Sequence, residues 1–279
     1  MSETNVDTTL PYYMLDPTSA FSDRGANYAS YRPSYPTALI DTILKGLGQP
    51  SHLTAADIGA GTGIASRLLG DRGVRVMAIE PNASMRHAAE PHPLVEFCDA
   101  SAEATNLAEA SIDLITSFQA FHWFDPIPTL SEFRRILKST GRLAIVWSKL
   151  AEDDQFSGGF DRLVKISMNG RSPTKPSGGL NQLLSSSPHF AGIRRHTFTH
   201  KHELDLMGTI GYALSKSFVP REGVAHQQLI SNLKELHAHW ANDRGLVSFV
   251  HRITVYLAEP QRSQLSRFRT SLQGLFLGR

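Results

Sequence analysis

The chain has 279 residues, of which 41% are hydrophobic and 19% are charged, a balance typical of a globular protein that buries a sizeable core. The formal net charge is only +2. Because no block of about five or six like charges concentrates it, we expect no nucleic-acid partner. The single cysteine, Cys98, excludes an internal disulfide and a cysteine-based metal cluster, so we predict no metal site. The first residues lack the basic start and apolar run of a signal peptide, and no run of about 18 apolar residues occurs. We therefore expect a cytoplasmic protein that acts without a membrane partner.

The chain begins with a polar segment that contains Pro11 and Pro17, and we expect residues 1–20 to form a flexible arm. Residues 21–258 follow as one predicted domain. The first helical pattern of this domain has apolar residues between 39 and 47, and Pro36 is suited to its first turn.

Short β-rich runs then alternate with helical patterns. Strands are expected at 54–58, 74–80, 95–99, 112–117 and 141–147, with helices near 63–70, 83–90 and 128–138. Strands that alternate with helices of about 8 to 12 residues predict right-handed βαβ units. The fold class is therefore α/β, with a parallel sheet that helices cover on both faces.

The regular alternation stops near residue 150. Residues 150–190 are rich in glycine, proline and serine, which predicts an excursion from the sheet. A strand at 192–204, helices near 207–216 and 223–240, and a last strand at 246–258 are expected next. Residues 259–279 carry apolar residues at helical spacing, so we expect an amphipathic helix or tail there. We expect it to dock on the domain or on a second copy of the chain rather than on a membrane.

A glycine-rich segment, DIGAGTGI (57–64), follows a predicted strand and opens a predicted helix. Gly59, Gly61 and Gly63 let a ligand approach the backbone and tolerate the dihedral angles of a tight turn. Glu80 closes the next strand, where a carboxylate can accept hydrogen bonds from both hydroxyls of a ribose. The pattern predicts a nucleoside-type ligand at this turn.

Two more polar positions follow the next predicted strands: Asp99 comes after VEFC, and Gln119 comes after IDLITS. In open α/β sheets, ligands bind beyond the carboxyl ends of the strands. We therefore expect both residues to face the same crevice as the glycine turn.

Five segments, taken in order, resemble the successive motifs of class I S-adenosylmethionine-dependent methyltransferases: DIGAGTGIASRLL, VMAIEPNASM, VEFCDASAEATNL, SIDLITSFQAFHWFD and EFRRILKSTGRLAIVW. The similarity spans about residues 54 to 148. The segments YASYRPSYP, SFVPREG and VSFVHRITVYL are further similar to a subgroup that includes trans-aconitate methyltransferase-like proteins. The resemblance implies a Rossmann-like, doubly wound sheet of seven strands, mostly parallel with an antiparallel last strand. It also implies a helical lid, formed by insertions at about 150–190 and 205–240.

The resemblance also implies which residues hold S-adenosylmethionine, whose product is S-adenosylhomocysteine. The three glycines would underlie the methionine part, and Asp57 would anchor its ammonium directly or through water. Glu80 would hold the ribose, Asp99 and Ala100 would meet the adenine, and Gln119 would lie beside the sulfonium. From the residues alone, Asp57 and Asp99 could instead be helix or turn caps, and Glu80 a solvated carboxylate.

Two further features concern the segment before the fold and the last of these motifs. Tyr28 and Arg32 precede the fold and are candidates to hold the cofactor carboxylate, since arginine grips carboxylates through two hydrogen bonds; the alternative is a solvated arginine in a lid. Residues 138–141 read Lys-Ser-Thr-Gly where the resembled family usually has a Pro-Gly-Gly turn, which predicts a looser turn.

The predicted reaction is a direct displacement of the methyl group by a small organic acceptor. Alignment of the reactants can supply about 7 to 11 kcal/mol of barrier lowering. A carboxylate acceptor needs no base and prefers a cationic clamp, whereas a nitrogen, carbon or hydroxyl acceptor could use His122 as a general base; an orienting or core role for His122 is the alternative. Phe121, Trp123 and Phe124 are candidate walls of the acceptor pocket or core residues.

Two other functions remain open from the sequence. A NAD-dependent dehydrogenase shares the glycine turn and the ribose acid, but the third glycine of its pattern would fall at Ile64, and a second cofactor half is absent. A methyltransferase-like binding module without transfer activity is the other. We expect a monomer or a homodimer.

Overall fold

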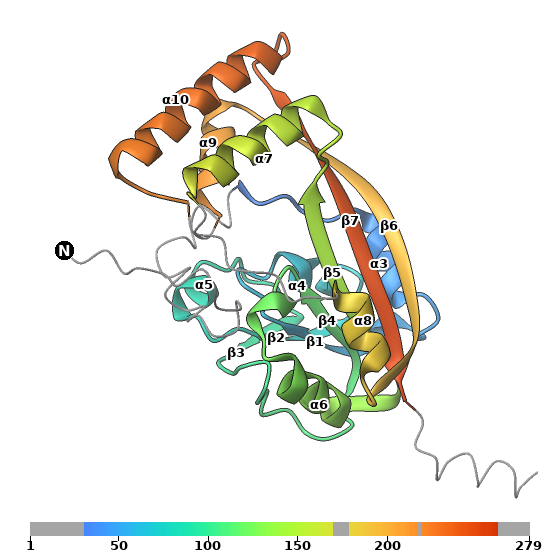
Figure 1. The fold of residues 1–279 in the computed structure, drawn as a ribbon. Helices are drawn as coiled ribbons and strands as arrows, with labels where there is room; N and C mark the ends of the chain where they lie inside the picture. The colour runs from blue at the N-terminus through green and yellow to red at the C-terminus, as the bar shows by residue number, and fades with distance from the viewer. Residues whose placement is uncertain (1–30, 170–178, 217–218, 262–279) are drawn as a thin grey trace, which may run out of the picture.

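The computed structural model describes residues 31–169, 179–216 and 219–261 (Figure 1). The expectations for the arm at 1–20, for Tyr28 and for most of the tail at 259–279 fall outside the described residues. The strands are β1 (Thr54–Ile58), β2 (Arg75–Ile79), β3 (Val95–Cys98), β4 (Ile112–Phe118), β5 (Leu137–Leu150), β6 (Phe190–Leu204) and β7 (Val247–Pro260). The helices are α3 (Thr37–Leu44), η2 (Pro50–His52), α4 (Ile64–Gly70), α5 (Ala83–His87), η3 (Phe121–Trp123), α6 (Pro126–Ile136), α7 (Gln155–Ser167), α8 (Gly179–Ser186), α9 (Leu206–Leu214) and α10 (Gly223–Trp240).

The seven strands form one sheet in the order β3-β2-β1-β4-β5-β7-β6. The strands from β1 to β5 pair in parallel, and β7 is antiparallel to both of its neighbours. This arrangement confirms the predicted Rossmann-like sheet, mostly parallel with an antiparallel last strand.

Helices cover both faces of the sheet because neighbouring residues of a strand point to opposite sides. Ala55 and Ala144 pack with α3 and α4 on one face. Ala56 and Ile145 pack with α6 and α8 on the other. The near-continuous apolar runs of the inner strands follow from this burial on two sides.

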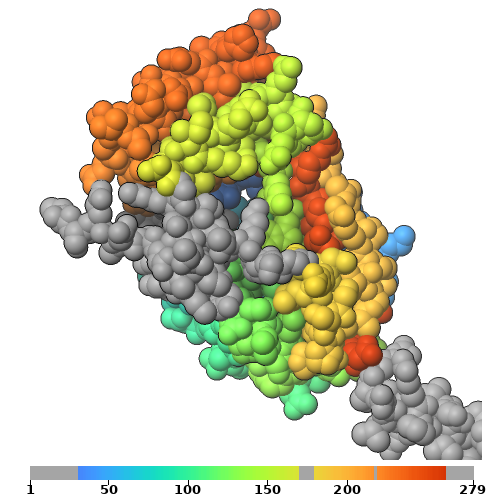
Figure 2. All heavy atoms as spheres, in the orientation of Figure 1, coloured from blue at the N-terminus to red at the C-terminus, as the bar shows by residue number. Residues whose placement is uncertain are grey.

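The last three strands are long and extend past the rest of the sheet (Figure 1). Around their far ends, α7, α9 and α10 form a third apolar cluster, in which Phe160, Tyr212 and Phe249 pack together. In Figure 2 the atoms of α7 and α10 form a mass beyond the sheet body. These helices lie in the two segments for which we predicted lid insertions, and their lid function stays a prediction.

Two local features need comment. Residues 138–141 belong to β5 but interrupt its pairing with β4, because Leu137 lies opposite Ile112 and Arg142 lies opposite Leu114; a Cβ atom at Gly141 would come within 2.9 Å of the Asp113 carbonyl oxygen.

The segment 150–190, for which we predicted an excursion from the sheet, contains α7 and α8. Gly158 and Gly159 of α7 are buried, and a Cβ atom there would lie 2.8 Å from the Glu152 carbonyl oxygen and 3.2 Å from Leu236, respectively.

No helix within the three described ranges is both long enough and apolar enough to span a membrane. The same residues contain no group of three or more histidine, cysteine or acidic side chains arranged to hold a metal ion.

A buried network fixes the loop between β3 and β4 against α6. The Glu132 carboxylate accepts hydrogen bonds from the Thr105 backbone N–H at 2.9 Å and from Arg135 Nε at 2.6 Å. The hydrogen bond from Arg135 is the main reason that the pKa of Glu132 falls to about 2. The network holds in place the loop that carries residues 100–103.

We predict that Glu132→Gln lowers the free energy of unfolding by about 1 to 3 kcal/mol at pH 7, the usual cost of disrupting a buried hydrogen-bonded group. Since the folded-state pKa lies below the unfolded value, this stabilisation is present above pH 4.5 and is lost as the pH falls towards about 2. Urea unfolding at pH 7 and pH 3 measures the difference, with the exposed Glu109→Gln as control. If the parent and Glu132→Gln differ in free energy of unfolding by the same amount at both pH values, the lowered pKa of Glu132 is wrong.

Candidate active site

The glycine turn follows the carboxyl end of β1 and links this strand to α4. Gly59, Gly61 and Gly63 all have positive φ angles, between 59° and 74°. A Cβ atom on Gly59 would lie 2.5 Å from the Ala120 side chain, and one on Gly63 would lie 2.9 Å from the Phe97 ring. The turn therefore requires glycine for both its backbone angles and its close packing.

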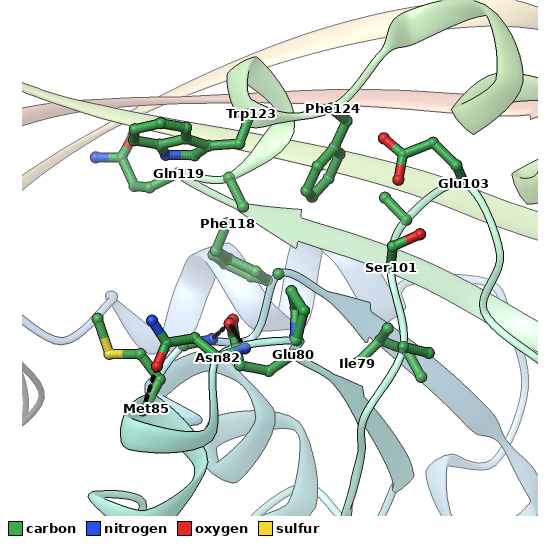
Figure 3. Close-up of a pocket in the computed structure, with 16 residues that line it drawn as sticks. Ile79, Glu80, Asn82, Met85, Ser101, Glu103, Phe118, Gln119, Trp123 and Phe124 are labelled. Atoms are coloured by element: carbon green, nitrogen blue, oxygen red, sulfur yellow. Dashed lines mark hydrogen bonds between the residues drawn. The ribbon is translucent and has the colours of Figure 1, made fainter. Parts of the chain in front are cut away.

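Glu80 follows β2 and is 8% exposed. Its carboxylate accepts the Gly61 N–H at 2.8 Å and the Asn82 N–H at 2.9 Å (Figure 3). Burial raises the pKa of Glu80, and the two backbone donors oppose that shift. A carboxylate has about four lone-pair positions, so the fixed side chain keeps acceptor capacity for a ligand hydroxyl.

A first cavity of about 130 Å³ opens beside Glu80. Figure 3 shows Glu80 and Asn82 on one side of it, with Trp123 and Phe124 on the opposite side. Its lining comes from the ends of four strands and the loops that follow: Gly59, Gly61, Ile79, Glu80, Pro81, Asn82, Met85, Ala100, Ser101, Ala102, Glu103, Phe118, Gln119, Ala120, Trp123 and Phe124. The mixture of apolar walls with the Glu80 and Glu103 carboxylates suits a nucleoside.

A second, smaller cavity lies beside Asp57 and is lined by Arg32, Pro33, Tyr35, Asp57, Gly59, Ala60, Ile64, Ala65, Phe118, Gln119, Ser148, Tyr212 and His251. The Asp57 carboxylate accepts hydrogen bonds from Ser66 Oγ at 2.6 Å and from Thr116 Oγ1 at 2.8 Å. Burial raises the pKa of Asp57 to about 6. An ammonium group placed here would favour the ionised carboxylate.

Gln119 lies where the two cavities meet, since Gly59, Phe118 and Gln119 line both. Its φ angle of 58° is uncommon for a residue other than glycine. The side-chain Nε2 donates to the Ser148 carbonyl at 2.6 Å. Backbone strain of this kind often marks a functional site. The hydrogen bond to Ser148 fixes the Gln119 side chain at the junction.

Comparison with known proteins agrees with this geometry. Residues 56–145 match the model of a methyltransferase domain. A methyltransferase of Mycobacterium tuberculosis is 27% identical over 238 residues, covering 83% of this chain and 92% of that protein. The malonyl-[acyl-carrier protein] O-methyltransferase of Pectobacterium atrosepticum is 33% identical over 99 residues, 34% of this chain and 39% of that protein. A type II methyltransferase structure from Anaeromyxobacter dehalogenans shares the fold, with a TM-score of 0.63 at 24% identity over 82% of this chain and 98% of its own.

This chain contains a methyltransferase domain, and the enzyme is a methyltransferase. The residues that match the methyltransferase domain, 56–145, include the glycine turn, β2, β3, β4 and most of β5. The narrower resemblance to trans-aconitate methyltransferase-like proteins stays a prediction.

The predicted cofactor residues of the methyltransferase differ in their placement. Gly59, Gly61, Glu80, Ala100 and Gln119 line the first cavity. The remaining glycine of the turn lies at the N-terminus of α4, outside both linings.

Asp99 lies outside the described lining of the first cavity. Its carboxylate pairs with Arg86 Nη2 at 2.8 Å, and its side chain is 68% exposed. The adjacent Ala100 lines the cavity instead. A contact between the Asp99 side chain and adenine stays a prediction, and it would require the pair with Arg86 to rearrange.

Arg32 lies at the second cavity, where its Nε donates to Ser215 Oγ at 3.1 Å and its Nη2 to the Ser215 carbonyl at 3.2 Å. The guanidinium carbon lies 5.8 Å from the centre of the Tyr212 ring. Arg32 and Asp57 therefore line the same cavity, at the end of the site where the resemblance puts the methionine part of the cofactor.

Residues 121–124, which we predicted to border the acceptor, have different positions in the structure. Trp123 and Phe124 line the first cavity, whereas Phe121 is buried in the core against the Phe133 ring. The His122 ring lies 5.3 Å from the Trp123 ring and 5.2 Å from the Trp147 ring, outside the described lining of both cavities. A role for His122 as a base stays a prediction.

Sequence reasoning missed several residues of the site. In the first cavity these are Asn82 and Met85 from α5 and its cap, together with Ser101 and Glu103. Their signal was position, because each follows a predicted strand end within a few residues. Nothing in the local sequence of His251, by contrast, indicated a place in the second cavity.

We predict that His202 and His251 each lower the stability of the folded methyltransferase as the pH drops from about 6.5 towards 4. Burial lowers the pKa of His202 to about 4 and that of His251 to about 3. The unfolded chain binds these two protons at higher pH than the folded chain does, so both histidines favour unfolding in acid, whereas Asp57, with a pKa raised to about 6, acts in the opposite direction. Thermal unfolding between pH 7.5 and 4.5 measures the slope.

His202→Asn should make this slope shallower, whereas the exposed His52→Asn should leave it as in the parent. Identical slopes for the parent and His202→Asn would show that His202 is not held neutral in the folded protein.

Proposed function

We propose that this methyltransferase transfers the methyl group of S-adenosylmethionine to a small organic acceptor, at the junction of the two cavities. The observation that carries the proposal is that Gly59, Phe118 and Gln119 line both cavities. A nucleoside in the first cavity and an amino-acid group in the second would meet at Gln119. The reacting centre would then lie between the two, as the resemblance implies.

The residues present fit the cofactor. Glu80 is fixed by two backbone N–H groups and can accept from the ribose hydroxyls, while Ile79 and Met85 supply apolar contacts for a flat base. Asp57 and Arg32 lie at the second cavity with opposite charges, which suits an ammonium and a carboxylate on one ligand. The cofactor supplies an electrophilic methyl group on a positive sulfur. The protein supplies orientation and exclusion of water.

The acceptor would enter from the side of the second cavity that β5, β7 and α9 form. These elements follow the part of the chain in which strands and helices alternate regularly. The Pectobacterium relative is an O-methyltransferase by name, which supports an oxygen nucleophile among the carboxylate, nitrogen, oxygen and carbon acceptors that the sequence leaves open. A monomer or a homodimer would serve this activity equally.

We predict that S-adenosylhomocysteine raises the melting temperature of the full-length protein and that NAD does not, because a ligand that binds only the native state stabilises it by mass action. Thermal shift measurements with a concentration series of each ligand test this. The reverse pattern would assign the site to a nicotinamide cofactor. A second test incubates the protein and S-adenosylmethionine with candidate acids, phenols, indoles and amines, and transfer should add about 14 Da to one of them, for one CH₂. Binding of S-adenosylhomocysteine without any such mass gain would indicate a binding module.

We predict that Glu80→Ala weakens S-adenosylhomocysteine binding by about 1.5 to 3 kcal/mol, the usual scale for a charged hydrogen-bond acceptor. Glu80→Gln should cost less because it keeps one acceptor oxygen. Isothermal titration gives both values, and the exposed Glu235→Ala serves as the matched control. Unchanged affinity in both Glu80 variants would rule out the ribose contact.

A further inference from the structure

The second cavity contains a serine whose two polar groups both have partners. Ser148 of β5 and His251 of β7 line this cavity, and the two strands run side by side (Figure 1). The Ser148 carbonyl accepts a hydrogen bond from Gln119 Nε2 at 2.6 Å, and Ser148 Oγ lies 3.1 Å from His251 Nδ1. The hydroxyl of one lining residue therefore contacts the ring of another.

The position of the ring proton of His251 decides which partner donates in this contact. Burial is the main cause that lowers the pKa of His251 to about 3, and nearby histidine and cationic side chains lower it further. At neutral pH the ring is thus uncharged, and one nitrogen carries a proton. In the described part of the chain Nε2 has no hydrogen-bond partner. Because a buried N–H without an acceptor is rarer than an acceptor without a donor, the proton belongs on Nδ1.

This tautomer determines what the Ser148 hydroxyl does. With Nδ1–H as the donor, Ser148 Oγ is the acceptor, so its own O–H is left to donate to another group. The residues that the structure describes give Ser148 Oγ no further hydrogen bond. Ser148 therefore offers one donor to a ligand in the second cavity.

Aromatic and imidazole rings shield His251 from water. The residue is 2% exposed. The centre of its ring lies 5.2 Å from that of His202 and 6.1 Å from that of Tyr212. Since water does not compete for Nδ1, the contact with Ser148 keeps a single direction.

The amino-acid group that the proposed function places in this cavity carries two charges with different needs. Asp57 suits the ammonium, and the carboxylate needs donors. Arg32 lines the same cavity, but its Nε and Nη2 already donate to Ser215, at 3.1 and 3.2 Å. A carboxylate has about four lone-pair positions, so a hydroxyl donor from Ser148 adds to what Arg32 provides.

We propose that Ser148 binds the cofactor carboxylate through its hydroxyl, and that His251 is the positioning residue that directs this hydroxyl into the second cavity. This inference rests on the proposed function and adds two residues to the cofactor site of the methyltransferase. The carbonyl of the same serine holds Gln119 at the junction of the cavities. Ser148 would thus link the binding of the carboxylate to the place where the methyl group is transferred.

The first experiment determines the tautomer in the full-length protein labelled with ¹⁵N-histidine, with S-adenosylhomocysteine bound. The His251 signals are identified by their loss in His251→Asn. At neutral pH the Nδ1 resonance should be that of a protonated ring nitrogen, and the Nε2 resonance that of an unprotonated one. The opposite assignment, or a doubly protonated ring, would overturn the inference.

The second experiment measures the affinity of Ser148→Ala by isothermal titration for two probes. These are S-adenosylhomocysteine and its decarboxylated analogue, which keeps the amine. The variant should bind S-adenosylhomocysteine about 10- to 100-fold more weakly than the parent, the effect of one hydrogen bond to a charged group. Its affinity for the analogue should stay within about 2-fold of the parent. Ser248→Ala, at an exposed serine of β7, should match the parent with both probes.

The third experiment tests whether His251 acts through Ser148. His251→Leu should weaken S-adenosylhomocysteine binding about 3- to 10-fold, the effect of one neutral hydrogen bond, and should leave the analogue unaffected. His251→Asn should restore most of this loss, because its amide can donate from the place of Nδ1. The double variant Ser148→Ala/His251→Leu should bind no more weakly than Ser148→Ala alone, since a positioning residue has no effect without the group that it positions.

The outcomes separate the two proposals. Failure of the parent to bind S-adenosylhomocysteine would overturn the proposed function itself. If the parent binds it and Ser148→Ala binds it equally well, or loses the same affinity for both probes, the carboxylate contact is wrong. Additive losses in the double variant, or no rescue by His251→Asn, would overturn the positioning role of His251.

Discussion

The hydrogen bond from the Gly61 N–H to the Glu80 carboxylate joins the two strand ends on which the active site depends. It connects the turn after β1 to the residue that follows β2, and a second bond from the Asn82 N–H fixes the other carboxylate oxygen. Because the carboxylate is buried and already oriented, a ligand that reaches it pays little to order the side chain. The positive φ angles of the glycine turn make this approach possible.

The site has two halves with different structural origins. The first cavity is built from loops that directly follow the parallel strands, as is general for open α/β sheets. The second adds residues from the long strands β5 and β7 and from α9, namely Ser148, His251 and Tyr212. Gln119 links the halves through its bond to Ser148. In the proposed function the cofactor spans both halves, with its nucleoside in the first cavity and its amino-acid group in the second.

Buried ionisable groups around the second cavity are compensated to different degrees. Asp57 is buried but receives two hydroxyl donors, so its charge has support. His202 and His251 are held neutral by burial and by neighbouring positive groups. Their neutral imidazoles lower the stability of the folded protein in acid, and one of them, His251, lines the second cavity. Such a cost is typical of groups that a ligand uses.

The sequence alone determined the sheet and the first half of the site. Hydrophobic alternation and glycine spacing are local signals, and they placed the seven strands within a few residues of their observed starts and ends, apart from the longer β5. Glu80 and Gln119 could be assigned because the ends of parallel strands meet at one edge of the sheet. The ordered motifs of residues 54–148 then indicated the methyltransferase class.

Only the tertiary structure decided the second half of the site. Ser148 and His251 are 103 positions apart and come together because β5 and β7 pair antiparallel, with Leu150 opposite His251. Asp99 pairs with Arg86, 13 positions earlier, and no pattern in its own strand indicates that partner. The helix α7 forms despite two glycines because they pack closely against Glu152 and Leu236. Each of these outcomes follows from contacts between segments that the chain order separates, so a local pattern carries no information about them.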